Sequence, residues 1–304
     1  MQKGLLITNA FLRSDKFDEL SRLFLEAADR LALSLLPFTN ADFLVLYTND
    51  GLHVVPGEKA LEALDPLPDF ILFWDKDIRL AEAFEQKGIP VFNSSRGILL
   101  CDDKSETLKA LAGRVKMPAS IMAPMTYEKE GCPDLSFLSV VEKKLGYPLI
   151  IKECFGSFGA QVHLAHDRDE AEEILHIIHY PFLFQEWIAE SAGSDLRLQV
   201  VGDRVVAAMR RENRSDFRAN LSNGGSMSAW KPSKEEEDLA LSACRLLGLD
   251  FAGIDILSGK DGPLLCEVNS NAHFKNITDC TGSDVASLIL KHCMEKSVGI
   301  CSEA

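Results

Sequence analysis

Residues 251–269 read FAGIDILSGKDGPLLCEVN, two apolar runs joined by the turn-forming segment SGKDG. The pattern predicts an antiparallel β-hairpin, and a pairing centred near Asp261 places Asp255 opposite Glu267. Strand side chains alternate, so Asn269 lies on the same face as Glu267. Two carboxylates and an amide oxygen converge there, and such ligands suit Mg²⁺ or Mn²⁺ held together with nucleotide phosphates. A solvated acidic face is the alternative, but the apolar neighbours predict a buried strand, in which an unpaired carboxylate is costly.

A second candidate site lies in PLIIKECFGSFGA, residues 148–160, where a strand carries Lys152 and a glycine-containing turn follows. Glycines let backbone N–H groups approach phosphate oxygens, and a lysine on a strand supplies a positive charge to them. We expect residues 162–164 to be the antiparallel partner of this strand. The chain has no Walker A motif, GxGxxG motif or kinase signature, which disfavours those nucleotide sites. An ordinary hairpin with a glycine turn is the alternative.

A third feature is a concentration of arginines in the segments SDLRL and MRRENRSDFRAN, at Arg197, Arg210, Arg211, Arg214 and Arg218. In a chain with 46 acidic and 32 basic residues, so many guanidinium groups need an anion or a set of carboxylate partners. Phosphates and a substrate carboxylate are the natural candidates. The alternative is a solvated charge run that neighbouring acidic residues partly neutralise.

Composition sets limits on the class of protein. The length of 304 residues exceeds the roughly 100–200 residues of one domain, so we expect two or three domains around a shared cleft. A net charge of −14 disfavours nucleic acid and anionic membranes as partners. The eight cysteines show no CxxC pair, which indicates reduced thiols in a cytoplasmic protein. Neither a signal peptide nor an apolar stretch of about 20 residues is evident.

Hydrophobic periodicity divides the chain into an α/β part and an α+β part. Strands are expected at 4–8, 43–47, 70–74 and 89–92, with helices at 17–31 and 80–87. This alternation predicts a parallel sheet in the first hundred or so residues. The later strands form hairpins, one of them turning at residues 202–203, and helices are expected at 105–111, 137–145, 169–178 and 233–247.

In their order along the chain, these segments resemble the ATP-grasp superfamily and, within it, the RimK-like α-L-glutamate ligases. The resemblance is carried by NSSRGILLCDDK at 93–104, LIIKECFGSFGAQV at 149–162, residues 185–211, DFRANLSNGG at 216–225, AGIDIL at 252–257 and LLCEVNSNAHF at 264–274. It implies a three-domain fold with ATP clasped between the last two domains. The implied domains are an N-terminal α/β domain at 1–97, a central lid with the glycine-rich loop at 98–181, and a C-terminal domain with the metal and substrate site at 182–304.

The resemblance also implies a role for individual residues. Asp255, Glu267 and Asn269 match the metal ligands. Of the implied catalytic residues, Arg197 or Arg211 would stabilise the oxyanion and the acyl phosphate, and Lys152 would neutralise charge on the transferred phosphoryl group. The residues implied to bind the nucleotide are Lys104, Lys152, Gly156, Ser157, Phe158, Gly159, Gln185, Glu186, Trp187, Ile188, Asp195, Arg218 and Asn220.

The implied function is an ATP-dependent carboxylate–amine ligase that uses ATP and Mg²⁺ or Mn²⁺ and acts through an acyl phosphate. Its substrates would be glutamate or a similar amino acid and a protein, peptide or small amine. Two alternatives are an ATP-grasp ligase of amino acid, cofactor or peptide biosynthesis, and a nucleotide-binding regulatory protein without turnover, which the complete metal set disfavours. Residues 270–274, SNAHF, depart from the proline-glycine turn of many relatives and leave the acceptor open. A homo-oligomer is a hypothesis from base rates alone.

Overall fold

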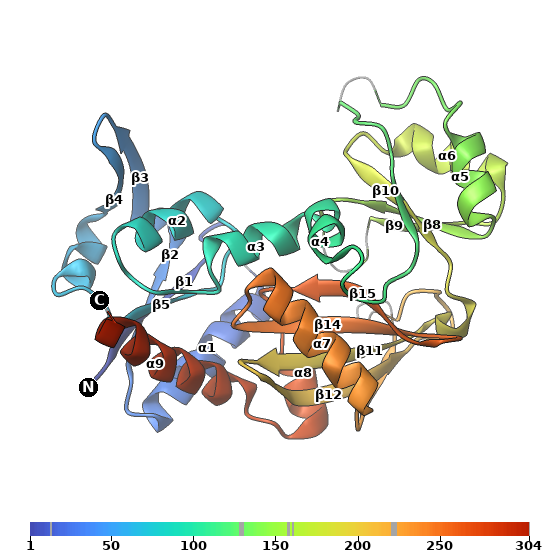
Figure 1. The fold of residues 1–304 in the computed structure, drawn as a ribbon. Coiled ribbons are helices and arrows are strands. Elements are labelled where there is room, and N and C mark those ends of the chain that lie inside the picture. The colour runs from blue at the N-terminus through green and yellow to red at the C-terminus, as the bar shows by residue number, and fades with distance from the viewer. Residues whose placement is uncertain (13, 128–130, 157–158, 160, 220–223, 304) are drawn as a thin grey trace.

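The protein consists of three sheets and a separate hairpin with helices packed around them (Figure 1). This computed structural model describes residues 1–12, 14–127, 131–156, 159, 161–219 and 224–303. The three sheets correspond to an N-terminal domain, a lid and a C-terminal domain. None of the helices in these ranges has both the length and the apolar character needed to cross a lipid bilayer.

The N-terminal domain has the predicted parallel sheet. Its strands are β1 (Lys3–Thr8), β2 (Ser34–Thr39), β5 (Phe70–Phe73) and β6 (Val91–Phe92), in the order β2-β1-β5-β6. Helices α1 (Asp15–Arg30) and α2 (Ile78–Gln86) pack against it, and α1 buries Leu20, Phe24 and Ala27 at the spacing of one helix face.

The expectation of a buried sheet strand at 43–47 was wrong. Strand β3 (Phe43–Thr48) pairs only with β4 (Gly51–Pro56), in a hairpin that projects from the domain (Figure 1). One face of this hairpin is exposed, with Leu44 at 67% and Leu46 at 49% exposure. The place beside β1 is taken by β2, which the periodicity did not reveal and whose Pro37 is tolerated because β2 is an edge strand. Two short 3₁₀ helices, η1 (Asn40–Asp42) and η2 (Glu58–Leu64), flank the hairpin.

The lid is a four-stranded antiparallel sheet covered by two helices. Strands β7 (Ser120–Met122), β8 (Leu149–Glu153), β9 (Val162–Ala165) and β10 (Phe182–Glu186) have the order β7-β10-β8-β9. Lys152 pairs with Val162, which confirms the predicted hairpin. Helices α5 (Leu138–Leu145) and α6 (Arg168–Ile177) cover the core around Phe182 and Phe184. The boundary expected between the lid and the C-terminal domain, at 181/182, falls before β10. In the structure β10 is hydrogen-bonded to β7 and β8 within the lid sheet.

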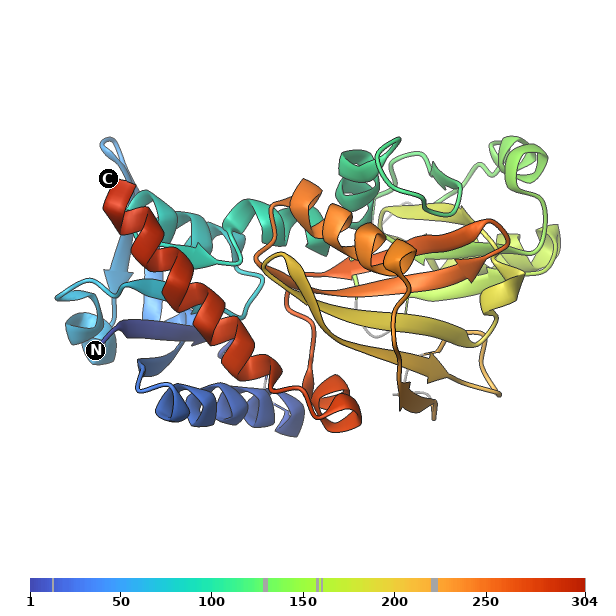
Figure 2. The same ribbon diagram turned by 60° about the horizontal axis from the view of Figure 1, so that its bottom comes forward.

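The C-terminal domain contains a five-stranded antiparallel sheet with one apolar and one polar face. Strands β11 (Ser194–Val201), β12 (Arg204–Glu212), β13 (Ser226–Ala229), β14 (Phe251–Gly259) and β15 (Gly262–Asn269) have the order β13-β12-β11-β14-β15. Helix α7 (Lys234–Leu247) covers the apolar face, where Ala243 packs with Leu198 and Ile254 (Figure 2). The 3₁₀ helix η3 (Ala189–Ser191) precedes β11. The other face of the sheet carries the charged residues that the sequence singled out.

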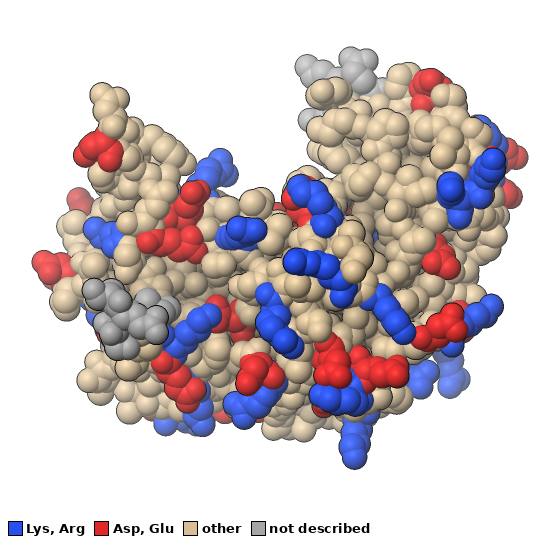
Figure 3. All heavy atoms as spheres, in the orientation of Figure 1, with Lys and Arg blue, Asp and Glu red and all other residues tan. Residues whose placement is uncertain are grey.

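Helices α3 (Ser95–Asp102) and α4 (Lys104–Leu111) connect the N-terminal domain to the rest of the chain. Figure 3 shows the surface hollowed between the projecting β3–β4 hairpin and the lid, and α3 and α4 lie below this hollow in the same view of Figure 1. Helix α4 begins between the lid and the C-terminal sheet, since its first residue, Lys104, contacts Gly156 and Glu267.

The last helices return to the N-terminal domain. Helix α8 (Lys275–Thr281) leads into α9 (Val285–Glu303), which packs against α1 and β5 (Figure 2). Phe251, Phe274 and Ile289 therefore share one hydrophobic core with Phe24 and Trp74. The N-terminal and C-terminal domains are not separable at this face.

Asn93 joins the two domains by hydrogen bonds. Its side chain is fully buried, and its Nδ2 donates to the carbonyl oxygens of Phe251 at 2.8 Å and Ser270 at 2.9 Å. Its Oδ1 accepts from the backbone N–H groups of Asp250 at 2.7 Å and Phe251 at 3.2 Å. This one side chain therefore fixes the end of β6 against the beginning of β14 and the residue that follows β15.

Candidate functional site

The hairpin of β14 and β15 places the predicted metal ligands together. Asp255 pairs with Glu267, and Gly253 pairs with Asn269. Nearer the turn, Ile256 pairs with Leu265, so Cys266 is an extra residue that forms a β-bulge. The bulge shifts the register by one residue and brings Glu267, rather than Cys266, opposite Asp255.

Asp255 is held by two arginines from the neighbouring strands. Arg197 on β11 makes a two-pronged ion pair with it, with one contact at 2.7 Å, and Arg211 on β12 approaches to 3.0 Å. Burial disfavours the charge of Asp255, but the two guanidinium groups outweigh it and hold the pKa of this carboxyl below its usual value. Arg211 also binds Asp195 through two contacts of 2.6 Å. The four side chains form a charge-balanced network across three strands.

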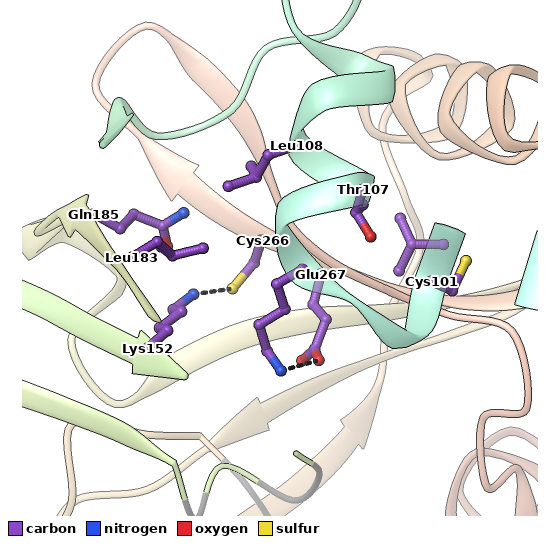
Figure 4. A pocket seen from close by; sticks show the side chains of 10 residues that line it. Cys101, Thr107, Leu108, Lys152, Leu183, Gln185, Cys266 and Glu267 are labelled. Atoms are coloured by element: carbon purple, nitrogen blue, oxygen red, sulfur yellow. Dashed lines mark hydrogen bonds and ion pairs between the residues drawn. The ribbon is translucent and has the colours of Figure 1, made fainter. Parts of the chain in front are cut away.

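Two lysines from different elements meet Glu267 and Cys266. Lys104, at the start of α4, lies with its Nζ 3.9 Å from Glu267 Oε1. Lys152 on β8 is buried, and its Nζ lies 3.8 Å from Cys266 Sγ (Figure 4). The two positive charges thus reach the bulge of β15 from opposite sides of a pocket, where an anionic group would find both.

This pocket has an apolar wall as well as charged groups. Its lining residues are Cys101, Lys104, Thr107, Leu108, Lys152, Leu183, Gln185, Cys266, Glu267 and Val268 (Figure 4). An apolar slot with a few polar groups is typical of a binding site for a planar ligand such as a nucleotide base.

The pocket includes residues that sequence reasoning missed. Thr107 and Leu108 lie one helical turn after Lys104, so the periodicity of α4 was a signal for them. Leu183 was likewise signalled by Gln185, two residues away on the same face of β10. Cys101 and Cys266 had no comparable local signal.

The glycine-rich loop contacts both a lysine and an arginine. The carbonyl of Gly156 accepts a hydrogen bond from Lys104 Nζ at 3.3 Å, and the carbonyl of Gly159 accepts one from Arg218 at 2.8 Å. Gly156 has a φ of +131°, a backbone conformation that favours glycine. Arg218 is also paired with Asp216 at 2.8 Å. The predicted site residues Ser157, Phe158 and Asn220 lie outside the described residues.

The segment 185–188 is only partly directed at the pocket. Gln185 is buried, lines the pocket and donates to Ser120 at 3.0 Å. The carboxylate of the exposed Glu186 accepts from the backbone N–H of Ala119 at 3.2 Å. Trp187 contacts Phe217 instead, and Ile188 is buried. The structure brings together the two lysines, Gln185 and Glu267, and it places Asp195 in the arginine network.

The donor set at the hairpin fits a hard divalent cation. Asp255 and Glu267 supply carboxylate oxygens. Glu267 is partly exposed toward the pocket, and among the described residues its only ion pair is the long contact to Lys104. The Asn269 side chain keeps a buried amide nitrogen without a hydrogen-bond partner in the structure. Rotation of this amide exchanges its nitrogen and oxygen, so Asn269 has an end available for a ligand. Two carboxylates and an amide, together with phosphate oxygens, suit Mg²⁺.

Comparison with known proteins identifies similar sequences. A family profile described as the RimK-like ATP-grasp domain matches residues 88–293. Uncharacterized protein MG012 of Mycoplasma genitalium is 30% identical over 276 residues, which cover 89% of this chain and 92% of that protein. A probable alpha-L-glutamate ligase of Stutzerimonas stutzeri is 37% identical over 221 residues, which cover 71% of this chain and 70% of that protein.

Two ligases of known structure share the fold. D-alanine–D-alanine ligase from Bacillus anthracis complexed with ATP superposes with a TM-score of 0.73 at 18% identity, covering 100% of this chain and 99% of that one. The ATP-grasp ligase PsnB complexed with a phosphomimetic variant of its minimal precursor, Mg and ADP gives 0.69 at 18% identity, covering 98% and 99%. The expected three-domain ATP-grasp fold is confirmed.

Proposed function

The chain belongs to the RimK-like ATP-grasp family, and on this premise we propose that it is an ATP-dependent carboxylate–amine ligase. It adds glutamate or a similar amino acid to a protein, peptide or small amine. The observation that carries the proposal is the convergence of Lys104, Lys152 and Glu267 on one pocket beside the arginine network. Named relatives support glutamate as a substrate, since they are probable alpha-L-glutamate ligases.

ATP occupies the pocket between the lid and the C-terminal sheet. The apolar wall formed by Leu108, Leu183 and Val268 holds the base, and Gln185 supplies a polar contact to it. Lys104 and Lys152 bind the phosphates, since both line the pocket with a positive charge, Lys104 beside Glu267 and Lys152 beside Cys266. Neighbours of the same fold contain ATP, or ADP with Mg, which supports these cofactors.

Asp255, Glu267 and Asn269 would hold Mg²⁺ or Mn²⁺. The bound ion would supply charge neutralisation for the transferred phosphoryl group. In the reaction, a carboxylate oxygen of one substrate attacks the γ-phosphorus and ADP leaves, giving an acyl phosphate. The amine of the second substrate, after losing a proton to solvent, then attacks the acyl carbon, and phosphate leaves with a second amine proton as the amide bond forms.

Arg197 and Arg211 stabilise the negative charge that develops on the reacting carboxyl group. Both are fixed in place by Asp255, and Arg211 also by Asp195, so they need little reorganisation during the reaction. Positioned donors of this kind are effective because their orientation is set before the charge develops. The closed lid excludes water, which would otherwise hydrolyse the acyl phosphate.

The test is ADP release from Mg-ATP with each of the twenty amino acids, alone and with peptide acceptors. Hydroxylamine is a second acceptor that traps an acyl phosphate as a hydroxamate. We expect Glu267→Gln to lower turnover roughly 100-fold or more with an unchanged melting temperature. Glu190→Gln, at an exposed position of η3, is the matched control. ATP binding without ADP release for any combination would favour the regulatory nucleotide-binding alternative.

A further inference from the structure

A second ligand site, separate from the pocket with the two lysines, is expected at the edge of the N-terminal sheet. In the order β2-β1-β5-β6, the chain passes from β1 to β2 on one side, and β5 lies on the other side of β1. The direction in which strands are added to the sheet therefore reverses between β1 and β5. In open parallel sheets, ligands bind at such a reversal, beyond the carboxyl ends of the strands. The residues that follow these two strand ends are Asn9, after β1, and Asp75, after β5. These positions lie outside the pocket between the lysines.

Asp75 is a buried carboxylate without a cationic partner among the described residues. It is 5% exposed, and Asn9 Nδ2 donates to its two oxygens at 3.1 and 3.2 Å. The backbone N–H of Lys76 adds a bond of 2.7 Å, whereas the Lys76 ammonium pairs with Asp102. Burial raises the pKa of Asp75 above its usual value. A carboxylate in such a place is stabilised when a cation binds to it.

Asp75 is joined to the loop that follows the metal strand. Asn271 Nδ2 donates to the backbone carbonyl of Asp75 at 2.8 Å, which leaves the buried Oδ1 of Asn271 without a donor in the structure. The next residue, Ala272, lies directly over Gly253, where a Cβ would be 2.5 Å from that of Ala272 and 3.2 Å from a side-chain atom of Arg197. The loop thus connects Asp75 to the catalytic face of the C-terminal sheet.

We propose that Asp75 binds the ammonium group of the amine substrate, with Asn9 orienting its carboxylate and Asn271 offering a second acceptor oxygen. The inference rests on the proposed function, and it assigns the amine side of the reaction to the carboxyl edge of the N-terminal sheet. The substrate class is a primary amine that is protonated when it binds, such as the α-amino group of an amino acid. An ammonium group has three N–H donors, and the carboxylate of Asp75 and the Oδ1 of Asn271 are acceptors of the kind that it needs.

The test separates binding of a charged amine from the rest of the reaction. The probe is an amino acid supplied as the acceptor amine, beginning with L-glutamate, at a saturating concentration of the carboxylate substrate and with ADP release as the readout. Hydroxylamine, which is uncharged at neutral pH, is the comparison amine, because its binding does not require the negative charge of Asp75. Asp75→Asn should raise the KM for the amino acid about 10- to 100-fold, from the loss of a charge-assisted hydrogen bond. Its KM for ATP and its rate of hydroxamate formation should stay within about twofold.

Two further variants test whether the effect of Asp75→Asn depends on the position of the charge and on the orientation of the carboxylate. Asp77→Asn makes the same charge change two residues away, at the N-cap of α2, where asparagine is equally suited, and it should behave as the parent. Asn9→Ala keeps the carboxylate but removes the amide that orients it, and it should raise the KM for the amino acid to a smaller extent.

An unchanged KM for the amino acid in Asp75→Asn would overturn the inference. So would an equal loss of hydroxamate formation, because a structural defect would affect both acceptors. If the parent protein forms neither the hydroxamate nor any amino acid product, the proposed function itself fails, and this outcome is distinct from the other two.

Discussion

Replacing Asn93 with alanine should loosen the junction between the N-terminal and C-terminal domains. The side chain makes four hydrogen bonds with the backbone of Asp250, Phe251 and Ser270, at distances from 2.7 to 3.2 Å. All four lie in a fully buried region, so alanine leaves two carbonyl oxygens and two N–H groups without this partner. At roughly 1 kcal/mol of net contribution per bond, the loss is about 4 kcal/mol.

The assay is urea denaturation followed by tryptophan fluorescence. Trp74 stacks on Phe251 with ring centroids 5.4 Å apart and an interplanar angle of 14°, so its emission reports on the same junction. Asn40→Ala is the control, because the Asn40 side chain accepts a single bond of 3.0 Å from Ala10 in a partly exposed place. We expect the control to lose about 1 kcal/mol. A loss in Asn93→Ala no larger than that of the control would refute the reasoning.

Two further predictions concern titratable groups. Burial opposes the charge of Asp250, but hydrogen bonds from His292 and Lys296 outweigh it and lower its pKa below the usual 3.8. The ionised Asp250 therefore stabilises the fold above about pH 4, and this contribution is lost as the pH falls through the lowered pKa. The parent should have a higher melting temperature than Asp250→Asn near neutral pH, and the difference should shrink on acidification. Burial raises the pKa of Cys101 to about 12 and that of Cys266 to about 11, so both thiols should react with iodoacetamide at pH 8 more than ~10-fold slower in the native protein than in urea. Mass spectrometry of the labelled peptides measures this, and rapid native labelling would contradict it.

The hairpin that carries the predicted metal ligands was predictable because its information is local. Apolar runs on both sides of SGKDG define two strands, and alternation then fixes the faces. The pairing of Asp255 with Glu267 was confirmed, although the sequence did not reveal the bulge at Cys266 that produces it. A bulge depends on how the sheet meets its neighbours, which a single strand does not encode.

The same reasoning placed β3 in the parallel sheet, whereas it lies in the separate hairpin with β4. Residues 43–47 are apolar at every position, as a buried parallel strand would be, but burial is decided by the elements that cover a strand. Here α2 covers one face only, and the other is exposed. The neighbouring β2 has a proline in its middle, which concealed it.

The pairing of Asp195 with Arg211 was within reach of the sequence. The predicted turn at 202–203 places these two residues opposite each other, or one residue apart, on paired strands. The contacts of Lys104 with Glu267 and of Arg218 with Gly159 were not, because they join residues from separate domains. Such contacts follow from the packing of the sheets, which local periodicity does not specify.

The return of α9 to the N-terminal domain has a consequence for synthesis on the ribosome. The core that Phe24 and Trp74 form on one side of the first sheet is completed by residues of the C-terminal domain, among them Met209, Phe251 and Phe274, and by residues of α9. The N-terminal domain therefore exposes an apolar surface until α9 has been translated. The nascent chain needs protection of that surface until then.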